Sequence, residues 1–258
     1  MLKLEQVEFS YPGHPVLQEI TLEIPPKSFL ALIGPNGSGK TTLLRLMSKV
    51  LRPQQGSIWL GGKPLSQLDA RALAKQLAVI SSEQHFDFPF LVRDIVAMGR
   101  FPHLSRLQRM SAHDWDIVRQ ALHLTSAEAL ENRPISQISS GEKQRVLIAR
   151  AIAQQPSILM LDEPNAHLDI NHQIAIFKLL RALNREHGLT IVLVLHDLTA
   201  AAAFCETICL LHCGKIVCMG RPEEVITADL IRQTYGAQVE VVPSPLGGFP
   251  QVVFGPER

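Results

Sequence analysis

A glycine-rich stretch directly after a short apolar run constrains this chain more than any other feature. The stretch is Gly34–Thr42, GPNGSGKTT, and the run before it is Phe29–Ile33. The pattern G-x-x-x-x-G-K-[ST] lets successive backbone N–H groups point at phosphate oxygens and lead into the N-terminus of the next helix. A glycine turn that happens to precede a lysine is the alternative, but the flanking apolar segments favour a strand, a phosphate loop and a helix.

The residues of this phosphate loop (Gly34–Thr42) have separate expected roles. Lys40 is expected to reach the β- and γ-phosphates as a point charge, and the Thr41 hydroxyl is placed to bind Mg²⁺. ATP and Mg²⁺ are therefore the predicted cofactors. The residues expected to bind the nucleotide here are Gly34, Pro35, Asn36, Gly37, Ser38, Gly39, Lys40, Thr41 and Thr42.

Composition excludes some classes of protein. The 258 residues include 25 basic and 24 acidic side chains, a formal charge of +1, so there is no electrostatic footprint for nucleic acid and no such partner is predicted. The first ten residues alternate apolar and polar side chains and predict a strand, not a signal peptide. The most apolar stretch, Thr190–Leu195, is too short to span a bilayer.

Four cysteines lie within one short segment and raise the question of a metal site. They lack the C-x-x-C pairs of zinc ribbons, and no histidine spacing in the chain matches a metal-ligand motif. We expect them to act as small buried apolar residues on a helix and a hairpin. They are Cys205, Cys209, Cys213 and Cys218.

Strand-like and helix-like segments alternate along the chain, which predicts an α/β fold with a mostly parallel sheet and the nucleotide at the carboxyl ends of its strands. The predicted strands are 3–9, 20–24, 29–33, 77–81, 158–161, 190–195 and a hairpin of 207–212 with 215–219. The predicted helices are 41–51, 112–122, 141–154, 172–186 and 228–235.

The same pattern predicts how this single nucleotide-binding domain is organised. Between about His85 and Gln155 only helices and loops are expected, so 85–155 is interpreted as a helical subdomain inserted into an ATP-binding core of 1–84 and 156–236. Residues 237–258 form a C-terminal tail, and its Pro- and Gly-rich part, Val242–Arg258, is expected to be loosely packed.

Two further strand ends carry side chains suited to ATP hydrolysis. The run ILMLDEP ends a strand at Asp162, a candidate Mg²⁺ ligand, and Glu163 is a candidate general base. A helix N-cap with a first-turn charge is the alternative for this acidic pair, but the upstream phosphate loop favours catalysis. His196 ends another apolar strand, TIVLVLH, where it could contact a γ-phosphate.

A second helix start has the properties of an anion site. Ser139 opens the helix that begins SSGEKQR, and the free amides of its first turn could bind a phosphate. Taken by itself, the segment is more simply a serine N-cap. Two phosphate-binding helix starts in one chain are nevertheless more than one nucleotide needs.

In the order of these motifs the chain resembles the ATP-binding-cassette (ABC) ATPases over almost its whole length. The resemblance adds Tyr11 as an adenine-stacking aromatic, the signature segment Ile138–Glu142 and a D-loop at Asn165–Asp169. It implies a P-loop NTPase core with an antiparallel β subdomain and the inserted helical subdomain. It also implies a head-to-tail homodimer, in which Ser139 and Gly141 of one copy close over the nucleotide held by Lys40 of the other, with Asp169 among the nucleotide-binding residues.

The chain departs from the family pattern at three places. The signature carries Ser140 and Glu142 where Gly and Gln are common, and Asn165 replaces the usual Thr or Ser of the D-loop. The glutamine expected after the strand 77–81 is missing from its usual position, which falls on Ser82. Gln84 is therefore the candidate substitute as a metal-contacting residue.

The segment VRDIVAMGRFPH, Val92–His103, resembles ATPases of importers for iron-siderophore complexes, haem and cobalamin. The resemblance implies two separate permease subunits, an extracellular or periplasmic substrate-binding protein, and a peripheral location on the cytoplasmic face of the membrane. Importers of molybdate or other oxyanions are an alternative, and a soluble ABC ATPase of iron–sulfur cluster assembly is a second one.

Overall fold

The computed structural model describes residues 1–81, 86, 88–105, 107–166 and 168–255, and it divides the chain into two compact units. The first unit comprises Met1–Gln67 and Thr190–Arg258, and the second comprises Leu68–Leu189. The segment 85–155, predicted to hold only helices and loops, lies inside the second unit, which also contains two strands and a long helix outside that segment.

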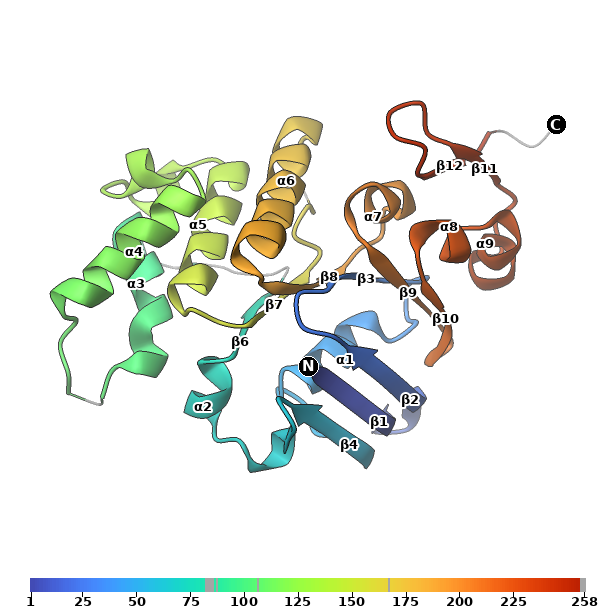
Figure 1. Cartoon of the computed structure of the whole chain (residues 1–258), viewed down its shortest axis with the longest axis horizontal. Coiled ribbons are helices and arrows are strands. Elements are labelled where there is room, and N and C mark those ends of the chain that lie inside the picture. Colours follow the sequence, from blue (N-terminus) through green and yellow to red (C-terminus); the bar gives the residue numbers. More distant parts are fainter. Residues whose placement is uncertain (82–85, 87, 106, 167, 256–258) are drawn as a thin grey trace. The chain divides into compact units, whose positions relative to one another are not determined.

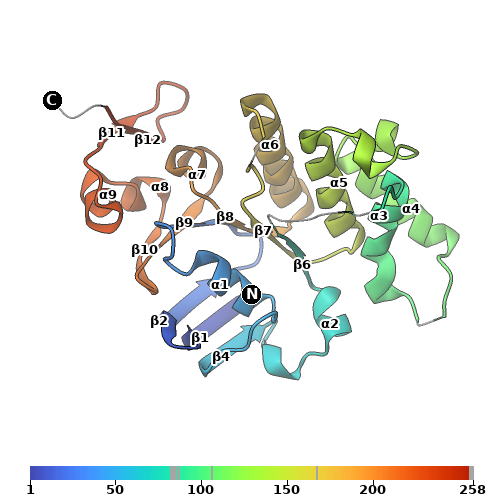
Figure 2. The same cartoon turned by 180° about the vertical axis from the view of Figure 1, so that it is seen from behind.

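The N-terminal part of the first unit is an antiparallel sheet in the order β2-β1-β4-β5. Alternating residues of β1 are buried, beginning with Leu2 and Leu4, as expected for a strand with one face on a core. Figures 1 and 2 show α1 (Lys40–Met47) lying against one face of this sheet. The strands are β1 (Leu2–Tyr11), β2 (His14–Ile24), β4 (Gln55–Leu60) and β5 (Lys63–Pro64).

A parallel arrangement in the first unit places the phosphate loop. Strand β3 (Phe29–Ile33) pairs in parallel with β8 (Thr190–Val194) on one side and β9 (Thr207–His212) on the other. Every residue of β3 and β8 is buried, which matches their continuous apolar sequences. Strand β10 (Lys215–Gly220) pairs antiparallel with β9, as the predicted hairpin requires.

The C-terminal segment differs from the prediction of a loosely packed tail. Strands β11 (Glu240–Pro243) and β12 (Pro250–Val253) form a hairpin beside α7 (Leu198–Phe204), as Figure 1 shows. The Val252 N–H donates to Thr199 Oγ1 over 3.3 Å, and Ser244 N donates to the Phe249 carbonyl across the turn over 2.8 Å. Pro243 and Pro250 form the pair next to the turn and Pro245 lies in the turn itself, so these prolines interrupt no interior pairing. The short helices that precede it are α8 (Pro222–Val225) and α9 (Ala228–Tyr235).

The second unit combines a parallel strand pair with helices. Strand β6 (Leu77–Ile80) pairs with β7 (Ile158–Asp162) in parallel, from Leu77 opposite Ile158 to Ile80 opposite Leu161. Figures 1 and 2 show α3, α4 and α5 lying together in this unit. The helices are α2 (Ala70–Ala74), α3 (Val92–Ala97), α4 (Ala112–Leu124), α5 (Ser140–Ala153) and α6 (Ile170–His187), and the longest 3₁₀ helix is η2 (Met98–His103).

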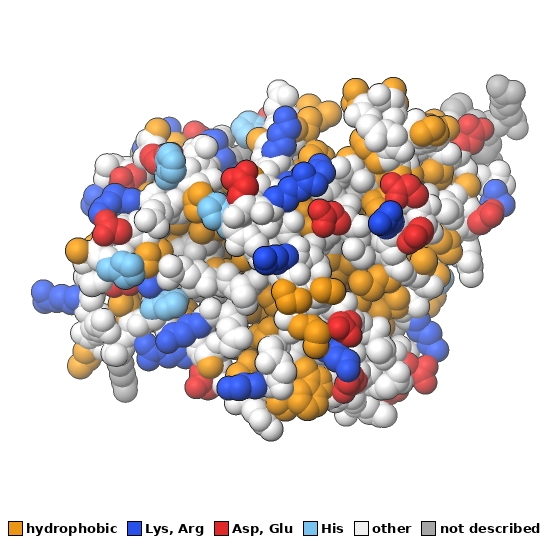
Figure 3. All heavy atoms as spheres, in the orientation of Figure 1, with side chains coloured by type: hydrophobic (Ala, Val, Ile, Leu, Met, Phe, Trp, Pro, Cys, Tyr) orange, Lys and Arg blue, Asp and Glu red, His pale blue; other side chains and the backbone are white. Residues whose placement is uncertain are grey.

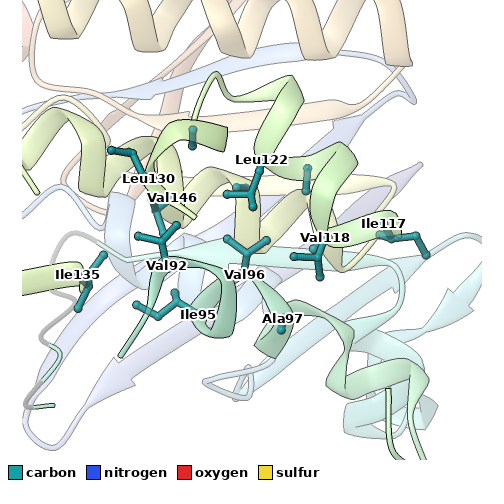
Figure 4. Close-up of a cluster of buried hydrophobic side chains, with 14 residues drawn as sticks. Val92, Ile95, Val96, Ala97, Ile117, Val118, Leu122, Leu130, Ile135 and Val146 are labelled. Atoms are coloured by element: carbon teal, nitrogen blue, oxygen red, sulfur yellow. The ribbon is translucent and has the colours of Figure 1, made fainter. Parts of the chain in front are cut away.

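A buried apolar cluster joins α3, α4 and α5, and Figure 4 shows its side chains pointing toward one another. Val92 and Val96 of α3 are fully buried, as are Val118 of α4 and Val146 of α5. Burial of one such side chain stabilises a fold by about 1.5–3 kcal/mol. The helices α3, α4 and α5 therefore share a buried apolar core of their own.

The segment GRFPH is a 3₁₀ helix whose backbone is held at several points. Arg100 is 4% exposed and donates from Nε to Asp114 over 3.1 Å and from an Nη to the Ala153 carbonyl over 2.8 Å. Arg71 donates to the carbonyl of Pro102 over 2.7 Å, and His103 Nε2 lies 2.9 Å from the carbonyl of Gln154. Phe101, between these anchors, is 63% exposed.

The surface carries mixed charge. On the face drawn in Figure 3, basic and acidic side chains are interspersed, in keeping with a net charge of +1. Of the helices in the described ranges, none is long and apolar enough to cross a membrane.

The cysteines follow the prediction only in part. Cys205 and Cys209 are buried, Cys218 is half-buried, and Cys213 is exposed in the hairpin turn. Burial raises the pKa of the Cys209 thiol to about 12, so this thiol stays protonated and packs as an apolar side chain. No metal-binding group of three or more His, Cys, Asp or Glu occurs among the described residues.

The Arg100–Asp114 ion pair is expected to stabilise the helical part strongly because both side chains are buried. Asp114→Asn should lower the free energy of unfolding by about 3 kcal/mol, since it leaves the guanidinium without its counter-ion. Urea unfolding followed by Trp115 fluorescence, in a Trp59→Phe background, measures the change. Asp116→Asn is the matched control on the same helix, where the exposed pair with Arg119 is worth at most about 1 kcal/mol. Equal effects of the two substitutions would contradict the expectation.

The same carboxylate gives a pH dependence. Hydrogen bonds from Ser111, together with the Arg100 guanidinium, lower the pKa of Asp114 from 3.8 to about 2. A lowered folded-state pKa adds stability that is present above about pH 3.8 and is lost as pH falls through about 2. The difference in stability between wild type and Asp114→Asn should therefore stay constant above about pH 4 and shrink between about pH 4 and pH 2.

Candidate nucleotide-binding site

The phosphate loop connects β3 to α1 in the first unit. Gly39 is the N-cap of α1, with φ 102°, and no side chain caps the helix. No acidic residue lies in the first turn. The start of α1 thus carries neither a side-chain cap nor a negative charge, at the end that the helix dipole makes positive and that favours anions.

Close packing leaves no room for side chains at two glycines of the loop. A Cβ on Gly34 would lie 2.1 Å from the Leu211 carbonyl oxygen, and a Cβ on Gly39 would lie 2.6 Å from Leu17 Cδ2. Gly39 also has a backbone conformation that other residues rarely adopt. Strands β2 and β9 thus pack against the two ends of the loop. This close packing explains why the sequence pattern requires glycine at positions 34 and 39.

Two polar side chains inside the loop fit a phosphate ligand. Lys40 is 5% exposed and its Nζ donates to the carbonyls of Gly34 over 2.8 Å and Pro35 over 3.0 Å. Ser38 Oγ is buried, and within the described part of the chain it has no hydrogen-bond partner. A buried hydroxyl without a partner costs about 1–3 kcal/mol, and phosphate oxygens would supply the missing partner.

His196 comes to the same end of the sheet as the phosphate loop. Leu32 of β3 pairs with Val194 of β8, so Gly34 and His196 both follow two residues after this pair. His196 lines a cavity of about 440 Å³ together with Tyr235 and Phe254. Burial raises the pKa of the Tyr235 phenol to about 12, so the ring stays neutral beside His196. Sequence reasoning did not select Tyr235.

Tyr11, the predicted adenine-stacking residue, is the last residue of β1. Its ring is 36% exposed and meets the ring of Phe9 edge to face, with centroids 5.0 Å apart. An edge contact of this kind fixes the plane of the exposed ring. A ring fixed in this way is suited to stacking against a flat base.

The second unit carries the two adjacent acids. Asp162 is the last residue of β7 and is 7% exposed. Glu163 follows with φ 52°, a left-handed conformation that is costly for a non-glycine residue, and a turn closes over it from Ala166 N to Glu163 O over 3.1 Å. Strain of this kind is concentrated at functional sites, and here it redirects the chain immediately after the strand.

Ser139 is the N-cap of α5, and it is engaged with its own helix. Its Oγ donates to Glu142 Oε2 over 2.9 Å and accepts from Glu142 N over 3.3 Å, while Ser139 N donates to the same carboxylate oxygen over 2.8 Å. The hydrogen bond from the Ser139 backbone N–H, and after it the bond from the Ser139 hydroxyl, lower the pKa of the Glu142 carboxyl group. The structure therefore shows the capping box that the serine N-cap alternative anticipated, closed by the glutamate that departs from the family pattern.

Asp169 is the N-cap of α6, where it accepts from the backbone and the ring of His172. The ring of His172 also lies against Gly141, so Gly141 and Asp169 are linked through one side chain. His172 is a second residue that sequence reasoning missed. The spacing D-x-x-H at a helix start could have indicated its bond to Asp169, but no sequence signal indicates the contact with Gly141.

Each unit carries, taken by itself, an oxygen donor of a kind that suits a hard cation. The hydroxyl of Thr41, in the first turn of α1, and the carboxylate of Asp162 are the kinds of ligand that Mg²⁺ prefers. Mg²⁺ is commonly held by one or two protein oxygens with substrate phosphates, so the lack of a larger acidic cluster among the described residues does not argue against it. Ser82 and Gln84, the candidates for the remaining metal contact, lie outside the described residues.

Known proteins match the chain in sequence and in fold. A family model described as "ABC transporter" matches residues 17–166. The ferric enterobactin transport ATP-binding protein FepC of Escherichia coli (strain K12) is 37% identical, over 98% of this chain and 93% of that protein. An inward-facing ABC transporter structure described as metal-chelate type has a TM-score of 0.86 at 26% identity, covering 98% of this chain and 96% of that one.

A third match is a dimer of the ATP-binding cassette MJ0796 bound to ADP and Pi, with a TM-score of 0.73 at 29% identity, covering 86% of this chain and 99% of that one. The α/β fold class, the resemblance and the ATPase assignment predicted from the sequence are confirmed by these matches. This chain therefore belongs to the ABC transporter family, as one of its ATP-binding, ATP-hydrolysing members.

Proposed function

We propose that this chain is the ATP-hydrolysing subunit of an importer that moves a metal chelate through separate permease subunits. The observation that carries the transport part is the segment Arg100–His103, whose backbone is fixed by Arg71, Arg100 and His103 while Phe101 faces solvent. An aromatic side chain held outward on a fixed backbone is well suited to binding a partner protein. The relatives FepC and the metal-chelate type transporter support the substrate class.

The chemistry that we propose is divided among named residues. The amides of the phosphate loop and Lys40 bind the phosphates of ATP, Ser38 donates to them, and Tyr11 stacks on the adenine. Thr41 and Asp162 hold Mg²⁺, which neutralises charge that develops on the phosphate oxygens. Glu163 takes a proton from the attacking water, and His196 contacts the γ-phosphate. Gln84 is kept as the proposed additional metal contact.

We propose further that two copies of the chain form the working ATPase, with Ser139, Gly141 and Asp169 of one copy facing the nucleotide of the other. The dimeric state of the cassette MJ0796 bound to ADP and Pi supports this arrangement. Exposed apolar side chains near Asp169 also support it, because Ile170 is 71% exposed and Ile174 is 38% exposed. Such side chains in adjacent turns of one helix are typical of an interface.

The permease is proposed to bind over the N-terminal part of the helical segment. Four large apolar side chains are exposed there. Single exposed apolar side chains are common on protein surfaces, whereas several in one segment indicate a binding surface. With no membrane-spanning helix in the described ranges, the proposed location is peripheral, on the cytoplasmic face, through the permease and with an external substrate-binding protein. The exposed side chains are Phe88, Phe90, Phe101 and Leu107.

Lys40→Ala should weaken ATP binding because it removes the buried cation of the loop. The loss of one or two charge-assisted hydrogen bonds predicts a roughly 10- to 100-fold higher Kd. Titration with a fluorescent ATP analogue measures the change, and Lys63→Ala, an exposed lysine of the same unit, is the control. An unchanged Kd in Lys40→Ala would remove this lysine from the site.

Glu163→Gln should bind ATP but turn it over more slowly by a factor on the order of 10² to 10⁴, because the amide cannot accept the proton from water. The variant should then elute as an ATP-bound dimer in gel filtration. Phosphate release and bound nucleotide are the two measurements, with Glu186→Gln on α6 as the control. Wild-type turnover in Glu163→Gln would show that another group is the base.

Phe101→Ser should separate ATP hydrolysis from transport. We expect basal ATPase activity to remain, while affinity for the permease falls by about 30-fold, the equivalent of about 2 kcal/mol for one aromatic anchor. Reconstitution with the cognate permease and a ferric siderophore measures stimulated ATPase activity and uptake. Leu246→Ser is the control, because Leu246 is an apolar residue of the other unit that is even more exposed than Phe101, at 89% against 63%. Equal coupling in both variants would remove the proposed docking role, and a soluble protein complex as the sole partner would contradict transport itself.

A further inference from the structure

The ring of His172 lies directly on the backbone of Gly141. A Cβ built on Gly141 would be 2.1 Å from Cδ2, 2.6 Å from Cγ and 2.8 Å from Nε2 of His172. No side chain atom can occupy such positions, so the contact is between the imidazole and the bare Cα of the glycine. Gly141 is the second residue of α5, and His172 lies in the first turn of α6, so the ring sets how closely the two helix starts approach.

The opposite edge of the ring is fixed by Asp169. Nδ1 lies 2.8 Å from Asp169 Oδ2, and the His172 backbone N–H donates to Oδ1 over 2.9 Å. The hydrogen bond from the His172 backbone N–H, and after it the bond from the His172 ring, hold the pKa of Asp169 below its usual value. The carboxylate is therefore ionised at neutral pH, and Nδ1 donates to it. The imidazole can neither rotate nor tilt without breaking a charge-assisted hydrogen bond.

The next residue ties the D-loop to the same helix start. Gln173 Nε2 donates to the Leu168 carbonyl over 2.9 Å and to the Asn165 carbonyl over 3.4 Å. His172 and Gln173 together connect α6 to the D-loop on one side and to the signature segment on the other. The signature serine, Ser139, is two residues before the glycine that the ring contacts.

We propose that His172 is a positioning residue that holds the signature segment at a fixed distance from the D-loop carboxylate of Asp169. This inference rests on the proposed function, in which both segments of one copy face the nucleotide bound by the other. His172 does not touch that nucleotide. It acts through Gly141 and Asp169, so its loss displaces both segments relative to each other and leaves the phosphate loop of its own chain intact.

The kinetic test compares three variants. His172→Ala should lower kcat by roughly 10- to 100-fold, the cost of a displacement of about 1 Å at a catalytic centre. The Kd of the isolated subunit for an ATP analogue should stay within about twofold, because the phosphate loop is unchanged. His172→Asn keeps a donor for Asp169 but lacks the ring, and should recover part of kcat. His187→Ala, at the other end of α6, is the control and should behave as wild type.

The structural test measures how Gly141→Ala changes the thermal midpoint with and without the His172 ring. Gly141→Ala should lower the thermal midpoint of the nucleotide-free protein because the methyl group collides with the ring. In the His172→Ala background the same change should leave the midpoint unchanged or raise it, because alanine is the better helix former. A Gly141→Ala effect that is the same in both backgrounds would overturn the contact.

The two tests also separate this inference from the proposed function. A wild-type protein without ATPase activity would refute the proposed function. The effect of Gly141→Ala on the thermal midpoint would still depend on whether His172 is present. If Gly141→Ala and His172→Ala have non-additive effects on the thermal midpoint but His172→Ala leaves kcat unchanged, the positioning role is overturned. The proposed function would stand. Partial rescue of kcat by His172→Asn, with unchanged nucleotide affinity in every variant, is the result expected from positioning.

Discussion

Helix α1 begins without a side-chain cap, so the packing of the first unit fixes its start. Most helix starts gain stability from a side-chain cap, but Gly39 provides none. The Leu211 carbonyl and the Leu17 side chain instead pack closely against two of the three glycines of the phosphate loop, Gly34 and Gly39, and β3 is fixed between β8 and β9. The buried sheet thus replaces local capping as the source of rigidity.

The three longest helices of the second unit, α4, α5 and α6, begin in the opposite way. Ser111, Ser139 and Asp169 each cap the helix that follows them, and the first two also receive a carboxylate from the third helical residue. Their geometry is fixed locally by a few hydrogen bonds, so it persists without a ligand. The unit that is expected to offer its helix starts to a second copy therefore keeps them pre-formed. Preformed groups lose less entropy when a partner arrives.

The sequence predicted the parts of the fold whose pattern is local. Strands β3, β7 and β8 are uninterrupted apolar runs, and the β9–β10 hairpin has a Cys-Gly turn, so their positions could be predicted to within a residue. Helix α7, with its run of four alanines, has no polar face to give a helical period, and it was not predicted. The prolines and glycines of the C-terminal hairpin predict loose packing from composition alone, whereas in the structure they lie in the turn or in the strand pair beside it.

The candidate site divides in the same way. Lys40, Asp162 and Ser139 belong to short motifs, and motifs of contiguous residues can be found without a structure. The contact of His172 with Gly141 depends on how α5 packs against α6, and the spacing of residues along the sequence does not predict that packing. The positions of Tyr235 beside His196 and of Arg100 in its buried ion pair are likewise properties of tertiary packing.

The capping box at Ser139 has a consequence for the order of events at a nucleotide. A serine hydroxyl has one hydrogen to donate, and here it is given to the Glu142 carboxylate. In the proposed dimer, a phosphate that reaches Ser139 competes with this carboxylate for the same O–H donor, so binding there would exchange one hydrogen-bond acceptor for another. The hydroxyl would donate to Glu142 again when the phosphate leaves. A chain with glutamine at this position would hold its serine with a neutral acceptor, and the exchange would start from a weaker bond.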